Sequence, residues 1–268
     1  MEQQEIFEKL WIDYVSHSPS TQQVYDLFKA EGEHVVNDHV AFRTFAHPSV
    51  CVDIIARPFI AAGYELKGEY TFETKKLFAK HYEHKMDPSA PRVFISELRY
   101  IELSPFLQDT VKKWIHSVPE CLLGSPDIIF SGNAAVTPSF ETYNKLREES
   151  EYAAWLYVNG FRANHFTVSV NHLKKFDTLA KVNDFLKKNG FHINDTGGEI
   201  QGTPEELLEQ SSIRAEMVEY AFTEGRFSIP GCYYEFARRY PGKDGKLYSG
   251  FIAKSADNIF RSTDFYQQ

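Results

Sequence analysis

Residues 37–45, NDHVAFRTF, place two ionisable side chains, His39 and Arg43, within a run of β-branched, aromatic and small residues. This composition predicts a β-strand. Side chains alternate between the two faces of a strand, so His39 and Arg43 share one face with Ala41 and Phe45. Burying an unpaired polar group costs roughly 1–3 kcal/mol. We therefore expect the polar face of this strand to meet water or a wet cavity.

Two further segments repeat this arrangement of a polar face on a predicted strand. In ANHFTVSVN, residues 163–171, His165 and Thr167 share a face. In YYEFARRY, residues 233–240, Glu235 falls on one face with Ala237 and Arg239. Each of these candidate ligands is followed two positions later by a small side chain, which would leave room for an ion.

His39, His165 and Glu235 together supply two imidazoles and one carboxylate from three predicted strands. Two histidines and one carboxylate form the facial triad of non-haem Fe(II) oxygenases, which leaves coordination positions open for other ligands. Arg43, on the same strand as His39, carries a planar fork that suits a carboxylate held through two hydrogen bonds. A structural ion pair of Arg43 with Asp38 or Glu97 is the alternative.

The order of the predicted elements indicates a duplicated unit within a single domain, residues 1–268. Each copy, at about 35–103 and 161–242, is expected to contain a strand, a helix and further strands. A glycine–aromatic pair, Gly63-Tyr64 or Gly190-Phe191, follows the expected end of each helix. Residues of about 104–160 have helical periodicity with proline and glycine breaks, which predicts an inserted helical layer. The fold class is therefore α+β.

The segment GTPEELLEQ, residues 202–210, carries the signals of a helix start. Thr203 is expected as the N-cap, Pro204 as the first helical residue and Glu206 as the second half of a capping box. The preceding Gln201 is a candidate either for substrate binding or for holding a turn.

Composition excludes several functional classes. The formal net charge of −8 and the pI near 5.7 argue against nucleic acid or an acidic membrane surface as a partner. The most apolar span is too short to cross a bilayer and carries charges. Three widely spaced cysteines do not form a disulfide framework, so we expect reduced thiols and a cytoplasmic protein.

Several separated segments resemble the 2-oxoadipate dioxygenase/decarboxylase family. They are NDHVAFRTF, ANHFTVSVN, IQGTPEE, PGCYYEFARRY and GFIAKSADNIF, and together they extend over nearly the whole chain. The resemblance implies two pseudo-repeated βαβββ-type units that form a vicinal-oxygen-chelate-like β-barrel with an inserted helical layer.

The same resemblance implies that His39, His165 and Glu235 are the ligands of Fe(II), and that Arg43 binds the substrate carboxylate. The implied reaction converts 2-oxoadipate and O2 to 2-hydroxyglutarate and CO2, within lysine catabolism. The implied partners are therefore a small 2-oxo dicarboxylic acid and O2. Other divalent metals are also accepted by histidine and carboxylate ligands.

Two other interpretations stay open. FISELRY, residues 94–100, aligns with YYEFARRY and sets Glu97 in the place of Glu235. A fourth ligand at Glu97 would indicate a glyoxalase-type isomerase or hydrolase that acts on a small 2-oxo acid without O2. The other interpretation is a binding module that holds a metal or a small acid without turnover.

Overall fold

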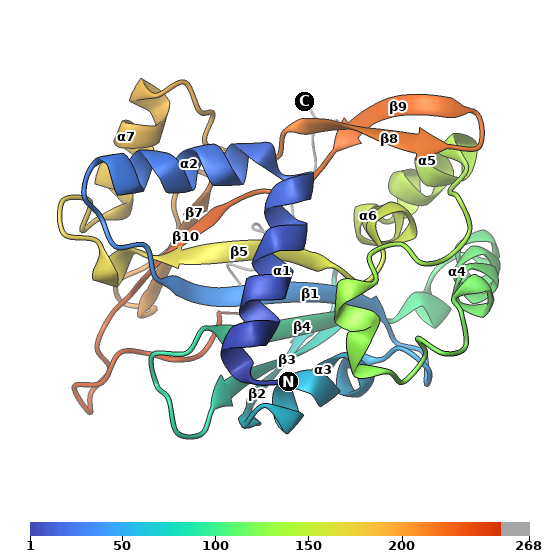
Figure 1. The fold of residues 1–268 in the computed structure, drawn as a ribbon, viewed down its shortest axis with the longest axis horizontal. Helices are drawn as coiled ribbons and strands as arrows, with labels where there is room; N and C mark the ends of the chain where they lie inside the picture. The colour runs from blue at the N-terminus through green and yellow to red at the C-terminus, as the bar shows by residue number, and fades with distance from the viewer. Residues whose placement is uncertain (253–268) are drawn as a thin grey trace. The chain divides into compact units, whose positions relative to one another are not determined.

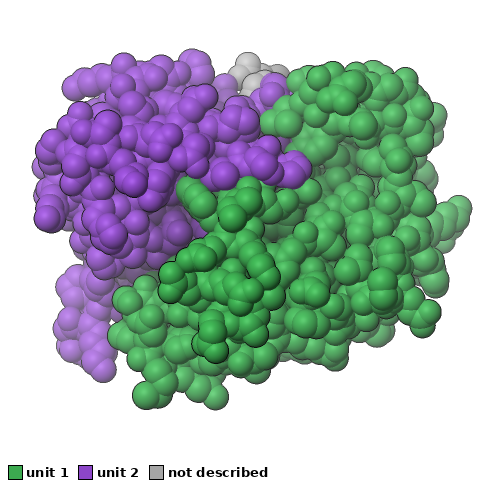
Figure 2. Space-filling model, in the orientation of Figure 1, with its two compact units in different colours: residues 1–14, 41–164, 218–229 green, residues 15–40, 165–217, 230–268 purple. Residues whose placement is uncertain are grey.

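The structure is a computed structural model that describes residues 1–252 and contains both helices and strands (Figure 1). Residues 253–260 of the family-like segment GFIAKSADNIF lie outside the described residues. Two compact units are distinguished, one of residues 1–14, 41–164 and 218–229, the other of residues 15–40, 165–217 and 230–268 (Figure 2). No helix among the described residues is long and apolar enough to cross a membrane.

The first unit combines a sheet with most of the helices. Its elements are the greater part of α1 (Gln3–His17) and of β1 (Asn37–Phe45), α3 (Val52–Ala61), β2 (Tyr64–Phe72), β3 (Leu77–His84), β4 (Arg92–Leu98), η1 (Tyr100–Glu102), α4 (Pro105–Ser117), η2 (Pro126–Phe130), α5 (Phe140–Glu149), α6 (Glu151–Asn159), β8 (Met217–Phe222) and β9 (Gly225–Pro230). The strand order is β2-β3-β4-β1. Phe59 of α3 packs on Phe42 of β1 with ring centroids 5.5 Å apart, which closes the core between helix and sheet.

The second unit contains the strands that carry the candidate ligands. Its elements are α2 (Pro19–Ala30), β5 (Ala163–Ser169), η3 (Val170–His172), α7 (Leu179–Lys188), β6 (Gln201–Thr203), β7 (Leu208–Ser212) and β10 (Glu235–Arg239), together with residues 37–40 of β1. The strand order is β5-β10-β7-β6. Phe28 of α2 contacts both Phe185 of α7 and Phe236 of β10, so the two helices cover the apolar face of β10.

The predicted helix ends are confirmed. α3 ends at Ala61 and α7 at Lys188, and Gly63 and Gly190 follow with φ of 100° and 87°. A positive φ strains any residue with a Cβ, so glycine is the residue that continues the chain there at little cost. All three cysteines are free thiols, as expected.

The prediction of a helix at residues 202–210 is wrong. β6 ends at Thr203, residues 204–207 form a turn, and β7 begins at Leu208. Thr203 Oγ1 accepts the hydrogen bond from Glu206 N that a capping box would make, but the chain closes into a hairpin. A Cβ at Gly202, where φ is 79°, would lie 2.1 Å from the Leu208 carbonyl oxygen. The close approach of the two strands therefore requires glycine at this position.

Residues 217–222, within the second predicted copy, form the strand β8. This strand pairs with β9 in a separate two-stranded sheet. The turn of this hairpin carries Glu224, which accepts hydrogen bonds from Phe140 N at 2.8 Å, Glu141 N at 3.2 Å and Ser139 Oγ at 2.7 Å. These contacts attach the hairpin to the N-terminus of α5, where the helix dipole favours a negative charge.

Glu224 therefore predicts a pH-dependent contribution to stability. Hydrogen bonds from the α5 backbone lower the pKa of Glu224 from 4.5 to about 2. Because its folded-state pKa is depressed, Glu224 stabilises the fold fully above its unfolded pKa, and this stabilisation is lost as the pH falls from about 4.5 to about 2. We expect Glu224→Gln to lower the thermal midpoint at pH 7 and to approach the wild type near pH 2. The exposed Glu205→Gln is the control, and a constant difference across this pH range would contradict the assignment.

Candidate metal centre

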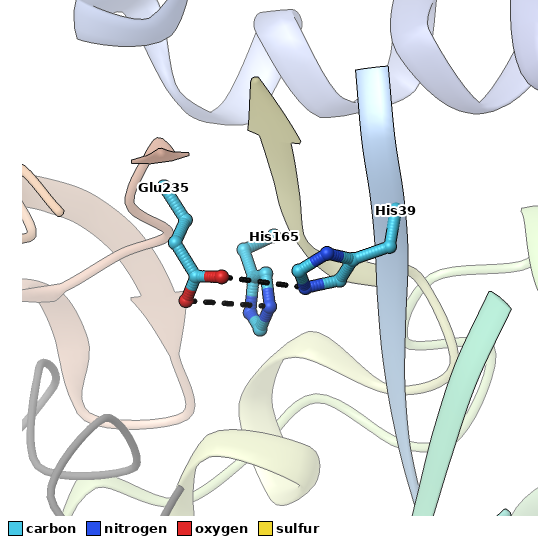
Figure 3. A group of neighbouring side chains, drawn as sticks. All are labelled: His39, His165 and Glu235. Atoms are coloured by element: carbon cyan, nitrogen blue, oxygen red, sulfur yellow. Dashed lines mark ion pairs between the residues drawn. The ribbon is translucent and has the colours of Figure 1, made fainter. Parts of the chain in front are cut away.

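The structure brings His39, His165 and Glu235 together, as the sequence predicted. One ligand atom from each lies within 4.8 Å of the others, and all three side chains are buried. Glu235 Oε1 lies 3.3 Å from His39 Nε2, and Glu235 Oε2 lies 3.8 Å from His165 Nε2 (Figure 3). The three side chains converge from β1, β5 and β10, with the two imidazoles facing the carboxylate.

Strand pairing explains why two of the three ligands meet. β10 runs parallel to β5, and Glu235 is in register with Thr167. His165 lies two residues before Thr167 and so points to the same face of β5. The diagonal neighbour on a paired strand is within reach of a long side chain, which brings the Glu235 carboxylate to the His165 ring.

His39 is oriented by its neighbour in the chain. Its Nδ1 lies 2.8 Å from Asp38 Oδ1, and a carboxylate only accepts hydrogen bonds. Nδ1 therefore carries the proton, and in the neutral ring Nε2 presents its lone pair towards Glu235 and His165. This is the carboxylate–histidine arrangement that typically orients a metal-binding imidazole.

Glu235 is held asymmetrically. Its Oε1 accepts hydrogen bonds from Gln210 Nε2 at 2.6 Å and from Thr167 Oγ1 at 3.2 Å. Its Oε2 is buried and accepts no hydrogen bond from any residue in the described part of the chain. One oxygen is thus fixed by the protein, and the other is directed at His165 with its lone pairs unsatisfied.

This donor set fits a divalent cation. A neutral imidazole nitrogen and a carboxylate oxygen both present lone pairs, and at 3.3 Å they repel unless they share a proton or a cation. A buried carboxylate oxygen without a hydrogen bond is costly for the same reason. Two imidazole nitrogens and one carboxylate oxygen are ligands accepted by Fe(II) and by several neighbouring metals.

The charges of the site are coupled through these contacts. Burial alone would lower the pKa of His39, but the hydrogen bonds and charges of Asp38 and Glu235 outweigh it and raise this pKa. Burial alone would raise the pKa of Glu235, but the charge of His165 and the contacts with His39 and Gln210 lower it. Both shifts have the same meaning, namely that this pocket stabilises a positive charge beside a carboxylate.

Aromatic rings surround the two imidazoles. Tyr233 stacks on the His165 ring, with centroids 4.9 Å apart and an angle of 29° between the planes. Phe251 meets the His39 ring edge-on at 4.9 Å. Phe251 belongs to GFIAKSADNIF, one of the segments that resemble the family. The residues around the ligands therefore limit the access of water.

Arg43 is buried, with 2% of its surface exposed. Its guanidinium lies over two aromatic rings of α6, at 5.0 Å from the Tyr152 centroid and 5.1 Å from the Trp155 centroid. The Tyr152 hydroxyl is itself fixed by hydrogen bonds with Ser96 Oγ and the Ser96 carbonyl. Cation–π contacts with these two rings limit the positions that the guanidinium can take.

The two carboxylates considered as partners of Arg43 have other contacts. Both Asp38 oxygens accept hydrogen bonds from Arg239, at 2.8 Å each. Glu97 Oε2 accepts a hydrogen bond from Val52 N, the first residue of α3, at 2.8 Å. Among the described residues, Glu97 does not join the group of possible metal ligands. A fourth ligand, the mark of the glyoxalase-type alternative, therefore has no support from the geometry.

Three residues around the candidate ligands were not singled out as members of the site from the sequence. They are Asp38, Thr167 and Gln210, all of which contact one of these ligands. Arg239, expected on the face of Glu235, is buried and donates its hydrogen bonds to Asp38. Asp38 precedes His39 and falls on the opposite face by alternation, so only the side-chain geometry links the two. Gln201, a candidate for substrate binding, donates to the carbonyls of Thr196 and Gly198 and so holds a turn.

Comparison with known proteins identifies related sequences. The sequence model of the 2-oxoadipate dioxygenase/decarboxylase family matches residues 11–121 and 129–246. A relative from Oryza sativa subsp. japonica, named chloroplastic/amyloplastic 2-oxoadipate dioxygenase/decarboxylase, is 34% identical over 93% of this chain and 75% of its own length.

Several solved structures are similar to this chain over most of its length. A hydroxyglutarate synthase from Oryza sativa, in complex with 2-oxoadipate, has a TM-score of 0.91 at 32% identity and covers 98% of this chain and 92% of its own. A protein from Shewanella frigidimarina, described as a hydrolase, has a TM-score of 0.89 at 45% identity and covers 94% of this chain and 98% of its own. A glyoxalase superfamily protein from Ralstonia eutropha is 21% identical, with a TM-score of 0.73 over 90% of this chain and 83% of its own. The last likeness confirms the α+β, vicinal-oxygen-chelate-like fold.

The position of Glu97 predicts a structural role that can be separated from metal binding. The N-cap of α3, Cys51, makes no side-chain capping bond, so Glu97 satisfies the first backbone N–H in its place. We expect Glu97→Ala to lower the free energy of unfolding by about 1 kcal/mol, the usual cost of a lost cap. Its affinity for cobalt(II), measured by chelator competition, should match the wild type. A loss of cobalt(II) affinity in a folded Glu97→Ala variant would instead support a metal site with Glu97 as its fourth ligand.

Proposed function

The chain belongs to the 2-oxoadipate dioxygenase/decarboxylase family, and from this premise we propose that it is an Fe(II)-dependent dioxygenase that converts 2-oxoadipate and O2 to 2-hydroxyglutarate and CO2. The observation that carries the proposal is the convergence of His39, His165 and Glu235 in a buried group with one unsatisfied carboxylate oxygen. A related rice structure, similar over nearly the whole chain, holds 2-oxoadipate.

His39 and His165 would hold the metal through Nε2, and Glu235 through Oε2. When bound, Fe(II) would supply the site at which O2 and the 2-oxo acid are activated, with coordination positions left open by a three-residue ligand set. Because the substrate carries its own 2-oxo acid group, the reaction requires no second 2-oxo acid. Zinc or nickel in a purified sample would be consistent with this ligand set without being the working metal.

The protein contributes orientation and exclusion of water. Asp38 keeps the proton of His39 on Nδ1, so that Nε2 remains a donor of electrons to the metal. Gln210 and Thr167 hold the other oxygen of Glu235 and prevent the carboxylate from turning away. Burial of all three ligands strengthens their electrostatic interactions with a cation.

Arg43 is proposed to bind a carboxylate of the substrate. It lies on the same strand as His39, and strand alternation directs both side chains to one face. The rings of Tyr152 and Trp155 make cation–π contacts with the guanidinium, and such contacts do not use its N–H groups as hydrogen-bond donors. These ring contacts and carboxylate binding are therefore compatible in the same side chain.

A hydrolase or isomerase is the second candidate, favoured by the description of the 45% identical Shewanella structure as a hydrolase. The two functions differ in their use of O2. The proposed place in lysine catabolism follows from the proposed substrate. The cytoplasmic location stays a prediction, and the rice relative is named as a plastid protein.

Oxygen consumption tests the proposal directly. The apo-protein is loaded with Fe(II) without air, 2-oxoadipate is added, and O2 uptake is followed together with CO2 and 2-hydroxyglutarate after air is admitted. We expect the three quantities to match one to one and to vanish in His165→Ala. Substrate turnover without O2 uptake would reject the dioxygenase in favour of the second candidate.

Metal binding is also expected to stabilise the fold. At a free metal concentration 100-fold above the dissociation constant, binding adds about 2.7 kcal/mol to the free energy of unfolding. For a chain of this size each kcal/mol corresponds to a rise of roughly 2–4 °C in the thermal midpoint. The midpoint of His165→Ala should not respond to metal. An equal response in both proteins would mean that the metal binds elsewhere.

Replacement of Arg43 by lysine tests the substrate anchor. Lysine keeps the charge but loses one of two charge-assisted hydrogen bonds, worth about 1.5–3 kcal/mol, so we expect KM for 2-oxoadipate to rise roughly 10- to 100-fold. Cobalt(II) affinity should not change, which separates this effect from damage to the metal site. Measured with 2-oxohexanoate, the effect should disappear if Arg43 binds the distal carboxylate and persist if it binds the 2-oxo acid end. An unchanged KM for both substrates would reject the anchor.

A further inference from the structure

Arg239 is the last residue of β10 and is a buried charged side chain, with 2% of its surface exposed. Its Nε donates to Asp38 Oδ2 and its Nη2 to Asp38 Oδ1, both at 2.8 Å. This is the two-bonded fork by which arginine fixes the plane of a carboxylate as well as its distance.

The carboxylate that Arg239 fixes is the one that orients His39. Asp38 Oδ1 contacts both Arg239 Nη2 and His39 Nδ1 at 2.8 Å. The position of the His39 ring therefore depends on Asp38, and that of Asp38 depends on Arg239. Burial alone would raise the pKa of Asp38, but the charge of Arg239 and the hydrogen bonds from His39 and Arg239 hold this pKa well below its usual range.

The other side of the same guanidinium holds the segment that follows the sheet. Arg239 Nη1 donates to the carbonyl oxygens of Tyr248 at 3.0 Å and Gly250 at 2.7 Å. Its guanidinium carbon lies 5.2 Å from the centroid of the Phe251 ring. Phe251 in turn packs edge-on against the His39 ring at 4.9 Å.

We propose that Arg239 is a positioning residue that ties the segment Tyr248–Phe251 to the metal ligand His39, through Asp38 on one side and through backbone carbonyls on the other. The part that concerns the metal rests on the proposed function. The tie to the segment rests on the hydrogen bonds alone. Arg239 thus sets the geometry of a ligand that it does not touch, and holds Phe251 against that ligand.

The neighbouring Arg238 provides a matched control. It lies on the same strand with the same charge, is partly exposed, and stacks over the Tyr240 ring at 5.0 Å. Arg238→Gln removes one positive charge from β10 without touching the contacts of Asp38. Any effect of total charge on metal binding will appear in both variants.

The test uses Arg239→Gln, Arg239→Lys, Asp38→Asn and the double variant Asp38→Asn/Arg239→Gln. Removing one partner of a buried ion pair leaves the other charge unpaired and destabilises the fold, so the double variant, which removes both charges, keeps the test valid if a single variant does not fold. Two quantities are measured in the full chain. The first is cobalt(II) affinity by chelator competition, and the second is amide hydrogen exchange of residues 246–252 in the metal-free protein.

We expect Arg239→Gln to weaken cobalt(II) binding by roughly 10- to 100-fold, the usual effect of losing an outer partner of a metal ligand. In the Asp38→Asn background the same substitution should cause little further loss of cobalt(II) affinity. The carboxylate that connects Arg239 with His39 is already absent from that background. Exchange of residues 246–252 should accelerate in both backgrounds, since the carbonyls are held by Arg239 directly. For both cobalt(II) affinity and amide exchange, Arg239→Lys should lie between the wild type and Arg239→Gln. Arg238→Gln should match the wild type in both quantities.

The outcomes separate the parts of the proposal. A folded Arg239→Gln variant with wild-type cobalt(II) affinity would overturn the route to His39, and unchanged exchange at residues 246–252 would overturn the tie to the segment. An equal loss of affinity in Arg238→Gln would show that net charge alone is responsible, which also overturns the positioning role. If the wild type binds no cobalt(II), the proposed metal site fails and the route to His39 fails with it. The exchange measurement then still decides the tie to the segment.

Discussion

The carboxylate of Asp38, shared between Arg239 and His39, is the interaction on which the arrangement of the second unit depends. A buried ion pair adds little stability over an apolar pair of the same volume, because both charges lose their hydration. Losing one partner, however, costs roughly 3–5 kcal/mol. The pair therefore acts as a constraint on geometry. It fixes one imidazole ring in a protein interior where packing alone would accept several ring orientations.

The polar face of β1 was expected to meet water or a wet cavity, and its His39 and Arg43 side chains are buried, each with 2% of its surface exposed. The neighbouring Asp38 is buried as well, with 3% of its surface exposed. Hydrogen bonds and ring stacking within the protein take the place of hydration for these groups. The exception among the described ligand atoms is Glu235 Oε2, which accepts no hydrogen bond from the described residues. A buried carboxylate oxygen that accepts no hydrogen bond and lies 3.8 Å from the His165 ring nitrogen is an arrangement that a bound cation would satisfy.

Sequence periodicity was sufficient to bring the candidate ligands together and insufficient for the residues that surround them. The alternation of side chains selected His39, His165 and Glu235 because all three lie on regular strands. Alternation directs Asp38 to the opposite face, and Arg239 offered no sign that its partner lay 201 residues away in the chain. The turn at 204–207 was mistaken for a helix start because the hydrogen bond from Glu206 N to Thr203 Oγ1 is the same in both structures. Local signals therefore cannot separate these alternatives, and the pairing of β6 with β7 decides between them.

Two buried arginines have different roles because their guanidinium groups are held in different ways. Arg239 uses its in-plane N–H groups on Asp38 and on two backbone carbonyls, so its hydrogen bonds are directed at the protein itself. The guanidinium carbon of Arg43 lies 5.0 Å from the Tyr152 ring centroid and 5.1 Å from the Trp155 ring centroid. Cation–π contacts do not use the N–H groups as hydrogen-bond donors, so they are compatible with hydrogen bonds to an added carboxylate. This difference supports the proposal that Arg239 positions a candidate metal ligand and that Arg43 binds an acid, although both are charged, buried and close in sequence to a predicted ligand.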